Sequence, residues 1–300
     1  MKNGYRKIWA TAGGMLLAAV ACVGGFGCSD GGAQSLREAR IQALGTGTRA
    51  GETKTIILPG GAEMEMVWCP PGTFTMGSPK EEGERQTWFE PSKSVAFLQA
   101  AGELPEDGDF ENLHPVTLTK GFWMAKTEVT QAQWTSVMEK NPSKFQGNNL
   151  PVEQVSRNDC LKFCRKTGLE LPTEAEWEYA CRAGSTGPFA GSGNLDEMGW
   201  HESNSGNRTH PVGQKAPNAW GLQDMHGNVE EWCEDKYQWD LGSDAVTDPL
   251  CTYVGRRNYD VTRGGSYRNE ARDCRSAYRN KELPTVSYWT IGFRPVVRGN

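Results

Sequence analysis

The apolar positions of this chain fall in short runs that glycine and proline separate, a pattern typical of many short elements. Alternating or continuous apolar residues predict strands at 56–58, 64–67, 73–76 and 116–124. The interval 80–112 is acidic and rich in turn residues, and it shows little periodicity. It is therefore interpreted as a surface insertion that could border a binding groove.

Three short helices are predicted by their first residues. In each, a Thr or Ser is followed three positions later by a residue whose side chain can reach back to its backbone N–H. The pairs are Thr130 with Gln133, Ser156 with Asp159, and Thr173 with Glu176. Apolar residues at helical spacing predict the buried faces, namely Trp134, Val137 and Met138; Cys160, Phe163 and Cys164; and Trp177, Ala180 and Cys181. Together these elements predict a mixed α+β fold.

Composition agrees with this pattern. The 300 residues include 36 Gly and 16 Pro, which disfavours long helical bundles and coiled coils because both residues interrupt helices. The 11 Trp, 8 Tyr and 10 Phe residues are enough to build a sizeable core, which argues against a disordered chain. The length allows one large domain or two small ones.

The N-terminus carries Lys2, Arg6 and Lys7, then an uncharged run over 8–27. This predicts a signal peptide at 1–28, with a retained membrane-spanning helix as the alternative. Cys22 and Cys28 each resemble the acylated cysteine of a bacterial lipoprotein. We expect an exported protein of the periplasm or cell envelope, which contacts the membrane only through this signal or a lipid, with a linker at 29–54.

Charge and cysteine content limit the partners. Without residues 1–28 the chain has 29 basic and 37 acidic residues and no basic cluster, so nucleic acid is excluded as a partner. Seven cysteines remain, an odd number of disulfide candidates for an exported protein. The absence of Cys-x-x-Cys and the presence of only four histidines disfavour a tetrahedral zinc site.

Several longer motifs occur in a fixed order. They are Leu-Pro-Thr-Glu-Ala-Glu-Trp-Glu-Tyr-Ala at 171–180, Gly-Leu-Gln-Asp-Met-His-Gly-Asn-Val-Glu-Glu-Trp at 221–232, Arg-Gly-Gly-Ser-Tyr at 263–267, Cys-Arg-Ser-Ala-Tyr-Arg at 274–279 and Ile-Gly-Phe-Arg at 291–294. With 66–77 and 127–130, this set resembles the formylglycine-generating enzyme, or sulfatase-modifying factor, family. The resemblance covers 55–298 and implies a C-type-lectin-like variant of the family fold with little regular secondary structure.

The resemblance also implies a chemistry. Family members oxidise a cysteine in a Cys-x-Pro-x-Arg segment of a sulfatase, using oxygen and a copper ion held by two cysteines. The matching positions here are Asn269 and Cys274, and Ser266 matches an active-site serine. Cu(I) favours thiolates, and an amide oxygen is a hard ligand. Glu230 also stands where the family usually has a Trp.

These departures predict a member of the family that lacks the two-cysteine copper site and serves as a binding or paralogous module for a peptide or small ligand. The alternative is a working oxidase of sulfatase cysteines, which needs Cys233 or Cys251 to approach Cys274. A third hypothesis is an oxidase with another substrate and metal. Cys274 could instead form a disulfide with Cys233 or Cys251, or lie buried as a thiol.

The resemblance further implies structural calcium at Asp224, Gly227, Val229 and Glu231, since hard oxygen ligands and a glycine at the bend suit this ion. The alternative is a hydrogen-bonded turn without metal. A second calcium site at Asn204, Ser205 and Asn207 has less support, because the loop is short. His210 and His226 lack partners at a nucleophile or metal spacing and are interpreted as surface or turn residues. Hydrolase chemistry has no motif to support it.

Overall fold

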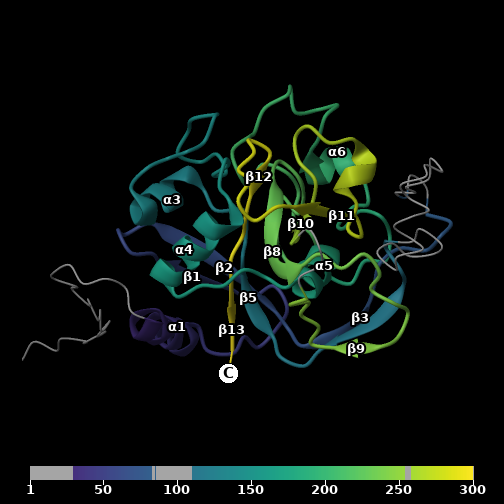
Figure 1. Ribbon diagram of the computed structural model, residues 1–300, viewed down its shortest axis with the longest axis horizontal. Helices are drawn as coiled ribbons and strands as arrows, with labels where there is room; N and C mark the ends of the chain where they lie inside the picture. The colour runs from purple at the N-terminus through teal and green to yellow at the C-terminus, as the bar shows by residue number, and fades with distance from the viewer. Residues whose placement is uncertain (1–29, 83–84, 86–109, 254–257, 300) are drawn as a thin grey trace, which may run out of the picture.

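The computed structural model describes residues 30–82, 85, 110–253 and 258–299 (Figure 1). The predicted signal peptide, with Cys22 and Cys28, and most of the insertion at 80–112 lie outside these residues. Within the described ranges, no helix combines the length and apolar character that a membrane span requires. The segment expected to be a linker differs from that expectation. It contains helix α1 (Asp30–Leu44), which packs against the domain and buries Leu44 in its core.

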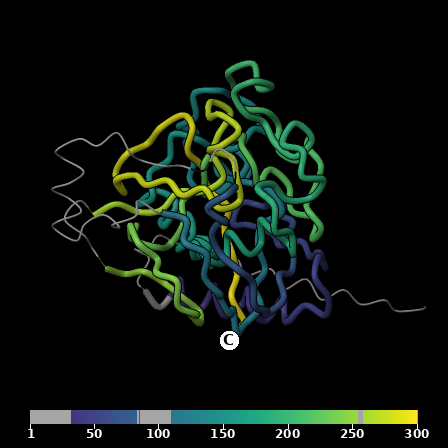
Figure 2. Tube along the Cα trace, turned by 90° about the vertical axis from the view of Figure 1, so that its right-hand side faces the viewer, coloured from purple at the N-terminus to yellow at the C-terminus, as the bar shows by residue number. Residues whose placement is uncertain are grey.

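The first sheet brings the two ends of the domain together. Its strand order is β1 (Thr53–Ile57), β2 (Glu63–Cys69), β5 (Phe122–Ala125) and β13 (Val296–Arg298), and every pairing is antiparallel. Figure 2 shows the C-terminal strand running among segments of the N-terminal half. Helix α1, with α3 (Gln131–Met138) and α4 (Arg157–Thr167), lies beside this sheet (Figure 1).

A second sheet carries most of the recognisable motifs. Its order is β11 (Arg279–Glu282), β10 (Asp260–Arg263), β8 (Glu230–Lys236) and β12 (Ile291–Gly292). The β8–β12 pairing is parallel, and the other two are antiparallel. Helix α5 (Glu174–Arg182) packs against β8 and β10.

The remaining described elements are short. One sheet joins β3 (Gly72–Met76), β4 (His114–Leu118) and β9 (Val246–Thr247), and another joins β6 (Gly199–Trp200) and β7 (His226–Gly227). They are accompanied by α6 (Leu195–Met198) and the 3-10 helix η1 (Ala271–Cys274). The strand predicted at 116–124 is thus two strands, β4 and β5, because the chain turns at Lys120-Gly121 between them.

The predicted helix starts are confirmed. Thr130, Ser156 and Thr173 each accept a hydrogen bond from the backbone N–H three residues later, and the side chain at that later position accepts one in return. Each pair satisfies two of the N–H groups that a helix start leaves without partners. The predicted buried faces of α4 and α5 are also confirmed.

Arginine–carboxylate pairs that are buried or partly buried tie these short elements to one another. Arg279 donates to Glu174 at 2.6 Å, Arg298 to Glu176 at 2.7 Å, and Arg263 to Glu178. The insertion at 80–112 is anchored in the same way, because Arg275 donates to Glu111 at 2.7 Å. Glu111 is buried, so this end of the insertion belongs to the core rather than to the surface.

Candidate functional site

The segment that resembles the copper site is a tight turn between β10 and η1. Gly264 and Gly265 have φ of 93° and 67°, values that favour glycine. A Cβ on Gly265 would lie 2.7 Å from Cys274 Sγ, so only a glycine lets this thiol pack against the turn. The fold therefore brings Ser266, Asn269 and Cys274 into one small structure.

Asn269 is fixed in this turn by its own side chain. Its Oδ1 accepts a hydrogen bond from Ser266 Oγ at 2.5 Å, and its Nδ2 donates to Asp273 Oδ2 at 3.2 Å. Both ends of the amide are thus used within the turn. The position that the family fills with a thiolate is occupied here by a bonded amide.

Cys274 is a fully buried thiol. Burial raises its pKa, and the nearby carboxylates of Asp273 and Glu230 raise it further. Of the two alternatives offered for Cys274, the structure has the buried thiol and no disulfide with Cys233 or Cys251, since all seven cysteines of the described residues are free. One protonated thiol and one bonded amide do not fit a Cu(I) site, which needs soft thiolate ligands.

Glu230 fills the place of the family's Trp and is itself buried. Its Oε2 accepts hydrogen bonds from Thr262 Oγ1 and Asn280 Nδ2, both at 2.8 Å. Burial raises the pKa of Glu230 to about 7, although these two hydrogen bonds lower it. The carboxyl group therefore links β8, β10 and β11.

The segment expected to hold calcium is built on close backbone approaches. Gly227 has φ of 81°, and a Cβ there would lie 2.0 Å from the carbonyl oxygen of Trp200. Asp224 Oδ2 accepts a hydrogen bond from the Gly213 N–H at 2.6 Å, whereas its Oδ1 is buried without a partner. Asp224 is thus a buried carboxylate with one oxygen to spare.

Glu231 lies against a buried cation. Arg294 donates to it through Nε and Nη2 at 2.7 Å, and Trp177 Nε1 donates at 2.7 Å. Both Glu231 and Arg294 are almost completely buried. The guanidinium therefore supplies one compensating charge beside the expected calcium ligands.

Glu128 is a member of this cluster that the sequence analysis missed. It is fully buried, and neither of its carboxylate oxygens has a hydrogen-bond partner. Burial is the main cause that raises the pKa of Glu128, and the Asp224 carboxylate raises it further. The motif at 127–130 was recognised, but nothing local in it shows that its acid faces residues almost a hundred positions away.

The donor set partly fits a hard divalent cation. The site has three carboxyl groups, on Glu128, Asp224 and Glu231, and one guanidinium, on Arg294. If all three acids were ionised, two negative charges would be left without a compensating cation. Three of the carboxylate oxygens are buried and unpartnered, and oxygen is the ligand that calcium prefers. Against this, both oxygens of Glu231 are taken by Arg294, and no group of three His, Cys, Asp or Glu side chains forms a ready metal cluster in the described residues.

The second set of expected calcium ligands is used within its own turn. Asn204 Oδ1 accepts from the His201 N–H at 2.9 Å, and Ser205 Oγ donates to the Tyr267 carbonyl at 2.7 Å. Asn207 contributes its backbone N–H, which donates to Ser205 Oγ at 3.1 Å. These bonds hold the turn against the 264–269 segment, and the second calcium site stays a prediction.

The interpretation as a surface or turn residue is wrong for His226. His226 is fully buried and its Nδ1 donates to the Cys274 carbonyl at 2.8 Å, while its Nε2 accepts from the Ala190 N–H at 3.0 Å. Burial lowers its pKa to about 4, so it is a neutral link to the Cys274 turn. His210 is half-buried and stacks on Trp200 with 3.8 Å between ring centroids.

Comparison with known proteins identifies the family. The model of the sulfatase-modifying factor enzyme 1-like domain matches residues 58–299, so the chain belongs to this family. The formylglycine-generating enzyme of Mus musculus is 29% identical over 281 residues, covering 77% of this chain and 74% of that protein. A Paenibacillus barcinonensis protein named Chaperone protein LppX is 29% identical over 225 residues, covering 55% of this chain and 76% of that protein.

A solved structure supports the same conclusion for the fold. Treponema denticola variable protein 1 superposes with a TM-score of 0.68 at 26% identity, covering 82% of this chain and 99% of that one. The α+β class and the C-type-lectin-like variant of the formylglycine-generating enzyme fold are thereby confirmed.

Proposed function

We propose that this chain is a family member without the copper oxidase activity, and that it serves as an exported binding module for a peptide or small ligand. The observation that carries the proposal is the pairing of a buried thiol at Cys274 with a bonded amide at Asn269. The expected export signal supports the location, in the periplasm or cell envelope, and lies outside the described residues.

The physical reason is that Cys274 does not readily supply the thiolate that a copper ion needs. A copper ligand must be deprotonated, and burial together with two neighbouring carboxylates raises the pKa of Cys274. Asn269 cannot replace the missing sulfur, because its oxygen is hard and already accepts from Ser266. A relative in the same family is named as a chaperone, which supports a role for this domain other than oxidation.

The test is an oxidation assay with a restored cysteine. The purified chain, Cu(I), oxygen and a Cys-x-Pro-x-Arg peptide are incubated, and the peptide mass is followed. We expect no aldehyde and no stoichiometric copper. Asn269→Cys places a second sulfur in the turn and should bind Cu(I), whereas the matched variant Asn269→Ser should not. Aldehyde formation by the unchanged chain, abolished by Cys274→Ala, would overturn the proposal.

We also propose that calcium stabilises the segment at 224–231. Asp224, Gly227, Val229 and Glu231 would hold the ion, with Glu231 giving up its hydrogen bonds from Arg294, and Glu128 would add a further carboxylate. The support is the buried, unpartnered oxygen of Asp224 and those of Glu128. When bound, the ion would connect the segment at 224–231 to Glu128 and would stabilise the fold rather than act on a substrate.

A further inference from the structure

Four loops meet on one side of the Ser266–Asn269 turn. Phe145 contacts Tyr267 edge to face with 5.8 Å between ring centroids, and Ser205 Oγ bonds to the Tyr267 carbonyl. Lys144 lies 3.6 Å from the ring centroid of Trp289. The loops 143–150, 205–211, 266–269 and 286–290 therefore form one continuous surface, which we call the basic groove.

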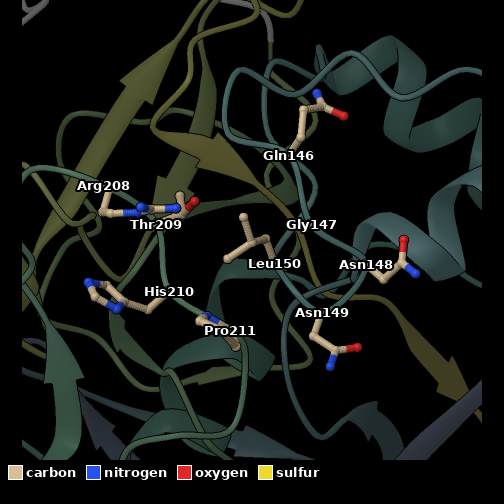
Figure 3. A pocket seen from close by; sticks show the side chains of 9 residues that line it. All are labelled: Gln146, Gly147, Asn148, Asn149, Leu150, Arg208, Thr209, His210 and Pro211. Atoms are coloured by element: carbon tan, nitrogen blue, oxygen red, sulfur yellow. The ribbon is translucent and has the colours of Figure 1, made fainter.

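A cavity of about 480 Å³ opens in this surface between segments 146–150 and 208–211. Figure 3 shows Arg208 and His210 on one side of it and Gln146 and Leu150 on the other. A volume of this size is within the range of ligand-binding clefts. The cavity is open to solvent, as expected for a surface that receives part of a larger partner.

Three exposed cations lie on these four loops, namely Lys144, Arg208 and Arg268, and Arg208 lines the cavity. In the part of the chain that the structure describes, none of them makes an ion pair with a carboxylate. Burial raises the pKa of the Glu153 carboxyl group to about 7, and the Lys144 ammonium offsets this only in part, without forming such a pair. Unpaired cations gathered on an acidic protein are a feature that complements an anionic partner.

Aromatic rings hold these cations in place. Trp289 has Lys144 Nζ at 3.6 Å and the Arg268 guanidinium at 5.9 Å from its ring centroid, and Arg208 lies 5.7 Å from that of Phe145. Such contacts restrict the charged groups and leave their N–H donors available.

We propose that the basic groove binds an acidic peptide segment, with Arg208 and Arg268 pairing to its carboxylates and Lys144 contributing a third charge. Guanidinium groups bind carboxylates through two parallel hydrogen bonds, which favours this chemistry. The proposal rests on the proposed function of a binding module and specifies its ligand. It also separates this chain from a reader of Cys-x-Pro-x-Arg, because the cations would repel the arginine of that segment.

The experiment measures peptide binding to the whole chain by fluorescence anisotropy. The probe is a labelled ten-residue peptide of Asp, Glu and Gly, compared with a peptide carrying Asn and Gln in their place and with a Cys-x-Pro-x-Arg peptide. The triple variant Lys144→Gln, Arg208→Gln, Arg268→Gln is matched by Arg49→Gln, Lys120→Gln, Arg165→Gln, which removes the same charge from exposed positions elsewhere.

We expect the acidic peptide to bind, to bind more weakly at higher salt, and to lose about tenfold in affinity in the groove variant but not in the matched variant. No binding of the acidic peptide, equal losses in both variants, or equal binding of the Asn and Gln peptide would overturn the proposal. These results are independent of the oxidation assay: aldehyde formation would remove the proposed function while leaving an acidic-peptide site in the groove.

Discussion

Arg294 supplies the buried positive charge beside the expected calcium ligands, and its replacement tests whether that charge holds the site together. Its guanidinium donates to Glu231 at 2.7 Å and to the backbone carbonyls of Ala125 and Gln223 at 3.2 and 2.9 Å. Arg294→Met keeps an unbranched side chain of similar length and removes the charge. Glu231 would then keep only the hydrogen bond from Trp177, with Glu128 and Asp224 as uncompensated neighbours.

The expected loss is large because one member of a buried pair is removed. Breaking such a pair costs about 3–5 kcal/mol, since the remaining charge stays desolvated. In a domain of this size, 1 kcal/mol corresponds to roughly 2–4 °C in Tm, so the expected decrease is roughly 6–20 °C. Arg294→Lys keeps the charge but not the forked geometry, and its loss should be smaller.

Urea unfolding at neutral pH measures the free energy of unfolding for each variant, with Arg165→Met as an exposed control. Adding Glu231→Gln to Arg294→Met should recover part of the loss, because it removes one of the uncompensated carboxylates. A loss below about 1 kcal/mol for Arg294→Met would refute the reasoning, since breaking a buried pair costs several times more. The reasoning would also be refuted if the double variant, Arg294→Met with Glu231→Gln, were less stable than Arg294→Met alone.

Two further predictions concern other buried acids. Burial raises the pKa of Glu153 from 4.5 to about 7, so its folded-state pKa exceeds the unfolded value, and stability should fall as pH rises from about 4.5 through 7. Glu153→Gln should flatten this dependence, as measured by urea midpoints at pH 5 and pH 8, and an unchanged slope would contradict it. Calcium should stabilise the unchanged chain and so raise its Tm. At a calcium concentration a hundredfold above Kd, the free energy of unfolding should increase by about 2.7 kcal/mol. Glu128→Gln should reduce this gain and magnesium should not reproduce it, whereas a calcium-independent Tm would argue against the site.

Local features of the sequence were sufficient for part of the fold and part of the site. The pairs Thr130–Gln133 and Thr173–Glu176 could be predicted because both partners lie within four residues, where backbone geometry alone brings them together. The presence of Asn269 and Cys274 in place of two cysteines is likewise a property of the sequence. Strand limits were less accurate, since the turn at Lys120-Gly121 between β4 and β5 has no strong signal.

What the sequence by itself determined is therefore the family, the class of fold, the helix starts and the count of sulfurs at the site. The tertiary structure decided which groups interact: Arg294 with Glu231, Glu128 with Asp224, and the Lys144 ammonium with the Trp289 ring. It also decided that His226 is buried and that the seven described cysteines stay unpaired. The physical reason is that burial and long-range electrostatics depend on the path of the whole chain, whereas capping and residue identity depend only on neighbours.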